Sequence, residues 1–197
     1  MIWNIRSVIN IRYAQIRKMD ISNGEGLGIA LFVQGCIFHC YNCFNSETWD
    51  FNGGKEWTPE VEDKFIELAS RPYIKRISLL GGECLADENL DGVLNLVNKI
   101  RFLMPEKTIW LYSGYTWEDI WNYGTSGTDL LGKEWYGWTS EQIKRQQILS
   151  NCDVLVDGRY IDSQRNIQLQ YRGSENQRVI NIQESLQKGE IVLWENN

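Results

Sequence analysis

Short apolar runs, each about the length of a strand, alternate with segments of helical periodicity from about residue 28 onwards. An apolar run of this length, bounded by turn residues, is typical of a buried strand. The chain has four such runs, at residues 29–34, 74–80, 108–112 and 153–156. Because strands that alternate with helices build a parallel sheet covered by helices, the pattern predicts an α/β fold.

The segments between these runs carry the signals with which helices begin. Thr58 and Pro59 are the residue types favoured at the N-cap and the first position of a helix. Apolar residues recur at helical spacing over residues 90–100, which predicts a second helix with one buried face. Capping-box sequences that begin at Thr116 and Thr139 predict two further helices.

The pattern is weaker at the two ends of the chain and in one internal segment. Residues 1–14 form an N-terminal extension, and residues 123–138 are rich in Gly, Thr and aromatic residues without clear periodicity. We expect a loop insertion or a lid at 123–138. Short strands are expected at 178–182 and 190–194. With no internal repeat and no linker, the sequence predicts a single domain over residues 1–197.

Composition narrows the class of protein. The chain has 197 residues, 43% of them hydrophobic, which is enough for a core and excludes a disordered chain. Its net charge is −6, with no basic run, so we expect neither nucleic acid nor an anionic membrane surface as the partner. No apolar run approaches the roughly 18 residues needed to span a bilayer, and no secretion signal is visible. We therefore expect a cytoplasmic protein.

Three of the five cysteines, Cys36, Cys40 and Cys43, lie within eight residues. In a reducing compartment such crowding indicates metal or redox chemistry rather than a disulfide framework. The cysteines follow the first predicted strand, and unusual glycine-containing loops at 81–84, 113–115 and 157–159 follow the other three. Because ligands of parallel α/β folds gather where the strands end, we expect these four loops to form one site. Turn-forming glycine is an equally good explanation for the last two loops.

The C-x3-C-x2-C spacing supplies three thiolates on a tight loop, which suits a cubic iron–sulfur cluster with one iron free of protein ligands. Zinc would need a fourth ligand, His39 or Cys84. His39 adjoins Cys40 and can hardly point at the same ion. If the loop did bind zinc, the protein would be a zinc-stabilised interaction domain, which is the alternative to an enzyme.

Together with a Gly-Gly-Glu turn after the second strand, the cysteine triplet resembles the radical S-adenosylmethionine superfamily. More narrowly, residues 15–180 resemble the activating proteins of anaerobic ribonucleoside-triphosphate reductases. The sequences that carry this resemblance are Asn23-Gly24-Glu25-Gly26, Gly35-Cys36, Cys43-Phe44-Asn45, Thr48-Trp49, Leu80-Gly81-Gly82-Glu83, Val156-Asp157-Gly158 and Arg172-Gly173-Ser174-Glu175-Asn176-Gln177-Arg178.

The resemblance implies a 4Fe–4S cluster on Cys36, Cys40 and Cys43, with S-adenosylmethionine chelated at the open iron. Reductive cleavage of the sulfonium would yield a 5′-deoxyadenosyl radical, which would abstract hydrogen from a glycine of the reductase large subunit. The cofactors carry this chemistry and the protein places them. Since no electron-delivering domain is visible, an external low-potential donor such as flavodoxin is implied.

The resemblance also assigns contacts with S-adenosylmethionine. Gly81 and Gly82 would let the backbone approach the methionine moiety, and Glu83 would accept a charge-assisted hydrogen bond from its ammonium group. Residues 42–44 would line the adenine side, where Phe44 offers a stacking face or is ordinary core. The full set of expected cofactor contacts is Asn42, Cys43, Phe44, Gly81, Gly82, Glu83, Ser113 and Asp157, the last of which has turn capping as an equal alternative.

The chain is too short for an eight-unit barrel of about 250 residues. The resemblance implies an open, incomplete (β/α) barrel with a mostly parallel sheet, whose open side would admit a polypeptide loop. The sequence departs from the family pattern at Cys84, where proline is usual, and at Asn42, where many superfamily members have an aromatic residue. The alternatives within the enzyme class are an activator of the pyruvate formate-lyase type and a small deazaguanine-forming enzyme. Neither is expected to carry the segment 172–178.

Overall fold

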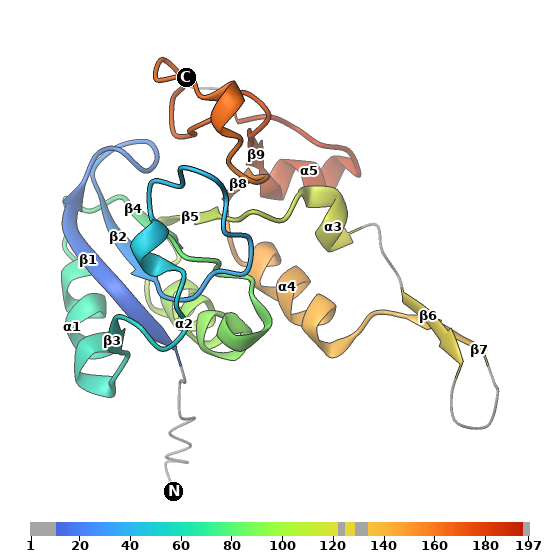
Figure 1. Cartoon of the computed structure of the whole chain (residues 1–197). Coiled ribbons are helices and arrows are strands. Elements are labelled where there is room, and N and C mark those ends of the chain that lie inside the picture. Colours follow the sequence, from blue (N-terminus) through green and yellow to red (C-terminus); the bar gives the residue numbers. More distant parts are fainter. Residues whose placement is uncertain (1–10, 122–124, 129–133, 195–197) are drawn as a thin grey trace, which may run out of the picture.

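A seven-stranded sheet forms the centre of the computed structural model, which describes residues 11–121, 125–128 and 134–194 (Figure 1). The strand order is β3-β1-β2-β4-β5-β8-β9. The four middle strands are parallel: β2 (Gly28–Val33), β4 (Arg76–Gly81), β5 (Thr108–Tyr112) and β8 (Val154–Asp157). Their C-terminal ends therefore meet at one edge of the sheet, as the sequence predicted.

Antiparallel strands extend this parallel centre on both sides. Strand β1 (Arg12–Asp20) pairs with β2, β3 (Lys55–Glu56) pairs with β1, and β9 (Arg178–Asn181) pairs with β8. The sheet is open, because β3 and β9 are its two edges. The expectation of a mostly parallel sheet is thus confirmed for the middle and wrong for the edges, where the sheet is mixed.

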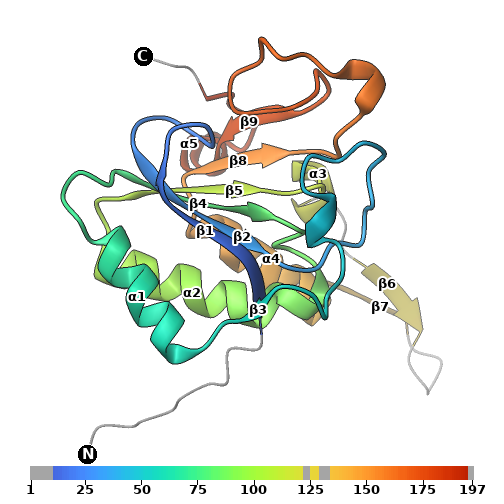
Figure 2. The same cartoon turned by 60° about the vertical axis from the view of Figure 1, so that its left-hand side comes forward.

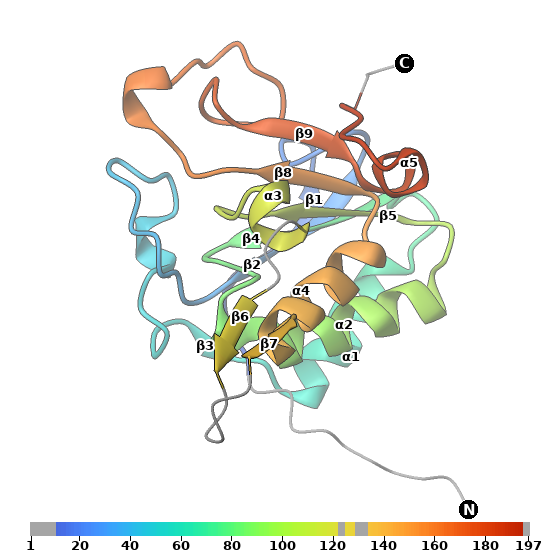
Figure 3. The ribbon, with the colours of Figure 1, turned by 90° about the vertical axis from the view of Figure 1, so that its right-hand side faces the viewer.

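Alternating residues of the parallel strands divide the core between the two faces of the sheet. Ile29, Leu31 and Val33 belong to the main hydrophobic cluster. Three of the helices that contribute to this cluster lie together on one face of the sheet (Figures 2 and 3): α1 (Pro59–Ala69), α2 (Leu90–Leu103) and α4 (Ser140–Ser150). Ala30 and Phe32 point to the other face, where the apolar clusters are smaller. That less filled face is where a cavity forms.

The helix starts predicted from capping residues are confirmed. Thr58 accepts a hydrogen bond from the Val61 amide at the start of α1, and Thr139 forms a full capping box with Gln142 at the start of α4. The helix predicted after Thr116 is short, α3 (Trp117–Trp121). None of the helices in these described ranges is long and apolar enough to cross a membrane.

Several boundaries differ from the predictions. Strand β1 begins inside the presumed N-terminal extension 1–14, of which residues 1–10 lie outside the described part. The segment 123–138, predicted as a loop, contains the antiparallel pair β6 (Thr125–Thr128) and β7 (Glu134–Gly137). Residues 123–124 and 129–133 of this segment lie outside the described part of the chain. The sequence of β6, Thr-Ser-Gly-Thr, has no apolar residue and so gave no alternation that would have indicated a strand.

The end of the chain also differs. The predicted strand 178–182 ends at Asn181, where the side chain caps a helix that the sequence did not predict, α5 (Ile182–Lys188). Within 190–194 there is only an isolated bridge, between Leu193 and Ile180. The chain is thus tied back to β9 without forming the expected strand.

Candidate functional site

A cavity of about 560 Å³ lies where the parallel strands end. Each of the four loops singled out in the sequence contributes to its wall, through Cys36, Gly82, Ser113 and Gly158. The prediction that these loops meet at one site is therefore confirmed. The sheet brings them together because β2, β4, β5 and β8 are parallel neighbours.

The cysteine loop is fixed at its base by main-chain hydrogen bonds. The amides of Gly35 and Cys36 donate to the carbonyl oxygens of Thr48 and Trp49, at 2.8 and 3.0 Å. Gly35 has φ +95°, in the left-handed region that favours glycine, and a Cβ there would collide with the ring of Phe51. The conformation of this loop thus depends on a residue directly before the first cysteine.

All three cysteines of the loop line the cavity and are partly buried. Burial raises the pKa of Cys36 and Cys40, while backbone amides act in the opposite direction, those of Phe38 and His39 on Cys36 and that of Tyr160 on Cys40. The Asn45 amide donates to the sulfur of Cys43 at 3.4 Å. Such N–H groups stabilise thiolates, the form in which cysteine binds metal.

The loop fits a cluster better than a single ion. Within the described residues, no three His, Cys, Asp or Glu side chains lie close enough together to hold one metal ion. The two candidates for a fourth zinc ligand have other environments: His39 stacks on Trp49 with 4.6 Å between ring centroids, and Cys84 is fully buried in the main hydrophobic cluster, which raises its pKa. A 4Fe–4S cluster binds each thiolate through a separate iron and does not need such convergence.

The Gly-Gly-Glu turn packs directly against the base of the cysteine loop. The Gly82 amide donates to the Val33 carbonyl at 2.8 Å, and the Glu83 amide donates to the Gly35 carbonyl at 2.7 Å. A Cβ built on Gly82 would lie 2.3 Å from the carbonyl oxygen of Gly35. Glycine at 82 is therefore required by the cysteine loop itself, whatever else approaches the turn.

The carboxylate of Glu83 is only 1% exposed and is held by three donors. Its Oε1 accepts from the Leu85 amide and the Ser113 hydroxyl, each at 2.8 Å, and its Oε2 accepts from the Gly114 amide at 2.7 Å. Burial raises the pKa of Glu83, and these hydrogen bonds act against that shift. Oε2 accepts one hydrogen bond here and has a lone pair for a further donor. The Ser113 hydroxyl is thus a hydrogen-bond donor to the Glu83 carboxylate.

Residues 42–44 do not all face the cavity. Phe44 lines it, 59% exposed, with its ring centroid 5.1 Å from that of Tyr160. The exposed Asn42 has φ +55°, and its amide donates to Asp162 at 3.2 Å. Asn42 is outside the cavity wall, whereas Cys43 and Phe44 are on it.

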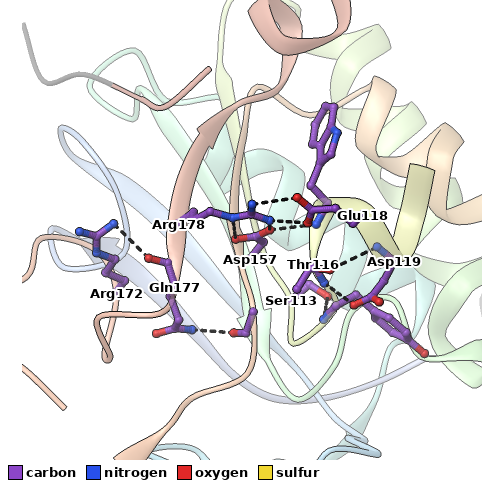
Figure 4. A network of polar contacts seen from close by, with 11 residues as sticks. Ser113, Thr116, Glu118, Asp119, Asp157, Arg172, Gln177 and Arg178 are labelled. Carbon is purple, nitrogen blue, oxygen red and sulfur yellow. Dashed lines mark hydrogen bonds and ion pairs between the residues drawn. The ribbon is translucent and has the colours of Figure 1, made fainter. Parts of the chain in front are cut away.

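Asp157 is also outside the cavity wall, in a network that ties the C-terminal strand to the sheet (Figure 4). Its Oδ1 accepts from Nε of Arg178 at 3.0 Å, and its Oδ2 accepts from the Trp117 amide at 2.8 Å and from Nη2 of Arg178. The same guanidinium bonds both carboxylate oxygens of Glu118, at 2.9 and 2.7 Å. In this arrangement Asp157 is a structural link between β8, β9 and α3.

Comparisons with known proteins agree with this site. A family model described as a 4Fe-4S single cluster domain matches residues 22–180. Relatives named anaerobic ribonucleoside-triphosphate reductase-activating protein include those of Vibrio cholerae and Escherichia coli K12, which are 36% and 33% identical over 85% of this chain and 96% of theirs. One from phage T4 is 32% identical over 86% of this chain and 93% of its own.

The chain belongs to the family of anaerobic ribonucleoside-triphosphate reductase-activating proteins.

The family match covers the cysteine loop, the Gly-Gly-Glu turn and the segment 172–178. Segment 172–178 lies beside the cavity, and its residues Arg172 and Gly173 form part of the wall. The side chain of Gln177 ties it to the loop after β8 by donating to the Gly158 carbonyl at 2.9 Å. The resemblance stated from the sequence is thus confirmed at the level of the family.

Sequence reasoning missed a stack of side chains that begins on the cysteine loop, at Phe38. Arg159 lies over the ring of Phe38 at 4.4 Å, Phe38 meets Tyr115 with centroids 5.0 Å apart, and Arg145 lies over Tyr115 at 4.7 Å. A Cβ on Gly114 would collide with Phe38. The stack joins residues from four distant segments, and no local pattern in the sequence signals it.

Proposed function

We propose that this protein reductively cleaves S-adenosylmethionine at a 4Fe–4S cluster and thereby generates a glycyl radical on the large subunit of an anaerobic ribonucleoside-triphosphate reductase. It would accordingly be an oxidoreductase of the radical S-adenosylmethionine type. The observation that carries the proposal is that three thiols and the Gly-Gly-Glu turn share the wall of one cavity. Family membership supports the choice of protein substrate.

Cys36, Cys40 and Cys43 would hold the cluster. When bound, the cluster and S-adenosylmethionine supply one-electron cleavage of the sulfonium and the hydrogen abstraction that leaves a radical on the partner's glycine. The backbone amides directed at the cysteine sulfurs would stabilise the thiolates and offset the negative charge that accumulates there. The main-chain contacts between the turn and the loop would keep cluster and cofactor in a fixed relation.

The turn and the loop after β5 would orient S-adenosylmethionine. Glu83 would accept from the ammonium group at Oε2, with Ser113 and Gly114 holding the carboxylate in place. Because Gly81 and Gly82 have no side chains, the backbone of the turn would be able to approach the methionine moiety. Cys43 and Phe44 would line the adenine side, and Asn42, which is outside the cavity wall, would contribute indirectly. For Asp157 we propose an indirect role, since its carboxylate is bonded to Arg178 and the Trp117 amide.

The open sheet suits a polypeptide substrate. The described part of the sheet ends in the edges β3 and β9 rather than closing on itself. We propose that this is an incomplete barrel of the radical S-adenosylmethionine type, formed as one domain, and that a loop of the large subunit enters its open side. Electrons would come from an external low-potential carrier such as flavodoxin.

The test is anaerobic reconstitution with iron and sulfide, reduction with S-adenosylmethionine present, and quantification of 5′-deoxyadenosine with and without a cognate large subunit. The proposal predicts about four irons per chain, cofactor cleavage, and a glycyl radical in the electron paramagnetic resonance spectrum of the partner. Cleavage without a partner radical would favour another substrate of the same enzyme class. A protein that binds zinc and does not cleave S-adenosylmethionine would instead indicate that the cysteine loop is a structural zinc site.

A further inference from the structure

The wall of the cavity is basic although the chain is acidic. Arg17, Arg159, Arg165 and Arg172 line it, and the only acidic side chain among the described lining residues is the buried Glu83. The whole chain, by contrast, carries 20 basic and 26 acidic residues. Positive charge is therefore concentrated at the site of the cysteines.

Two of these arginines, Arg159 and Arg165, are exposed and have no carboxylate partner among the described residues. Each guanidinium lies over an aromatic ring of the cysteine loop, Arg159 over Phe38 at 4.4 Å and Arg165 over Phe44 at 5.3 Å. The nearby Asp162 uses its two oxygens on the Asn42 amide and the Tyr160 hydroxyl. The two arginines thus keep their hydrogen-bonding groups available to a partner.

The arginines and the cysteine loop form one surface. The loop that carries Arg159 and Arg165 runs beside the cysteine loop in two views (Figures 2 and 3), and Phe44 contacts Tyr160. Arg159 is close enough to Cys40 to act on it electrostatically. A partner that touches these arginines would stand next to the cluster ligands.

Exposed apolar residues lie on the same two loops as the cysteines and the arginines. Tyr41 is 77% exposed and Ile167 is 86% exposed, and Ile37, Phe44 and Ile161 are also exposed. Aromatic and arginine side chains together are typical of the energetically dominant centre of protein interfaces. Apolar exposure and charge complementarity therefore point to the same surface.

We propose that Arg159 and Arg165, with the exposed residues Ile37, Tyr41 and Ile161, form the docking surface for an acidic electron-carrier protein. The proposal rests on the proposed function, because it assumes a cluster that must be reduced from outside. A carrier with a negative surface is repelled by the acidic remainder of this chain and attracted here, so its charge directs it to the cysteine loop. Such steering raises association rates by about 10- to 1,000-fold and weakens with salt.

The test compares reduction of the reconstituted cluster by reduced flavodoxin with reduction by dithionite, followed by the loss of visible absorbance at low and high salt. The variant is Arg159→Glu/Arg165→Glu. The matched control is Arg71→Glu/Lys75→Glu, which changes the net charge equally at two exposed residues of the segment between α1 and β4. Titration of flavodoxin into each protein gives the affinity independently of any turnover.

We expect the ratio of flavodoxin-driven to dithionite-driven rates to fall at least about tenfold in the Arg159/Arg165 variant at low salt, and to change little in the control. The affinity should fall in parallel. Equal ratios in both variants would overturn the proposal. It would also be overturned if flavodoxin reduction were normal but transfer of the radical to the large subunit failed, since the surface would then serve the polypeptide. An absence of S-adenosylmethionine cleavage with dithionite would instead refute the proposed function.

Discussion

Replacement of Gly82 by alanine tests how tightly the Gly-Gly-Glu turn and the cysteine loop are packed. The new Cβ would lie 2.3 Å from the carbonyl oxygen of Gly35, where real Cβ atoms keep at least 3.0 Å. The carbonyl must therefore move by several tenths of an ångström. It cannot move independently, because it accepts the Glu83 amide at 2.7 Å.

Two costs add up in this variant. Forcing a methyl group into a packed site costs about 1–3 kcal/mol. A buried amide whose acceptor has moved away costs about 1–3 kcal/mol. From the lower halves of these ranges we expect a loss of about 3 kcal/mol in the free energy of unfolding, which for a chain of this size lowers Tm by about 6–12 °C.

The assay is thermal unfolding of the reconstituted protein under anaerobic conditions, with iron content measured on the same sample. Gly137→Ala is the matched control, because a Cβ at Gly137 would meet nothing within 4 Å. We expect Gly82→Ala to lose both stability and iron, since the displaced carbonyl belongs to the residue before Cys36. A Gly82→Ala protein with the wild-type Tm and a full complement of iron would refute the reasoning and leave cofactor approach as the reason for this glycine.

Two further changes test other parts of the site, and a third tests the network around Arg178. Cys40→Ala should leave a folded chain that holds less than a full cluster and forms no 5′-deoxyadenosine, as iron and product analysis would show; retained cleavage would contradict the ligand assignment. Phe44→Leu should weaken the binding of S-adenosylmethionine by about 2- to 10-fold, the equivalent of ~0.5–1.5 kcal/mol for an aromatic contact, with iron unchanged; unchanged affinity would leave Phe44 no role in binding. The hydrogen bonds from Arg178 hold the pKa of Glu118 below its usual 4.5, so this pair stabilises the fold above that pH and the stabilisation is lost as the pH falls below it. Unfolding measured between neutral pH and pH ~3 should therefore show a smaller acid destabilisation for Glu118→Gln, and an identical pH profile would remove this ion pair from the account.

The parallel centre of the fold and the convergence of the four loops were predictable, because both follow from local patterns. Residues 29–33 form a continuous apolar run because β2 is buried on both faces. Thr58 and Thr139 cap helices by contacts within three residues. These signals do not depend on the remainder of the chain.

What could not be predicted depends on long-range contacts. Strand β1 has many exposed positions and is held largely by its pairing with β2, so its sequence lacks a strong alternation. Asp157 has the sequence position of a cofactor ligand, but its carboxylate bonds Arg178, which is 21 residues away. Arg159 meets Phe38 across an even larger separation in the chain. Such contacts follow from the assembled sheet and leave no signal in neighbouring residues.

The most direct test of the proposed activity follows the transfer of one hydrogen atom from a glycine of the large subunit to 5′-deoxyadenosine. A large subunit whose glycine residues carry deuterium at Cα is incubated anaerobically with the reconstituted, reduced protein and unlabelled S-adenosylmethionine, and the 5′-deoxyadenosine is analysed by mass spectrometry. The account predicts one deuterium in the product, together with a radical on the partner whose spectrum lacks the splitting of the α-hydrogen. Unlabelled 5′-deoxyadenosine, or a partner without a radical, would contradict it.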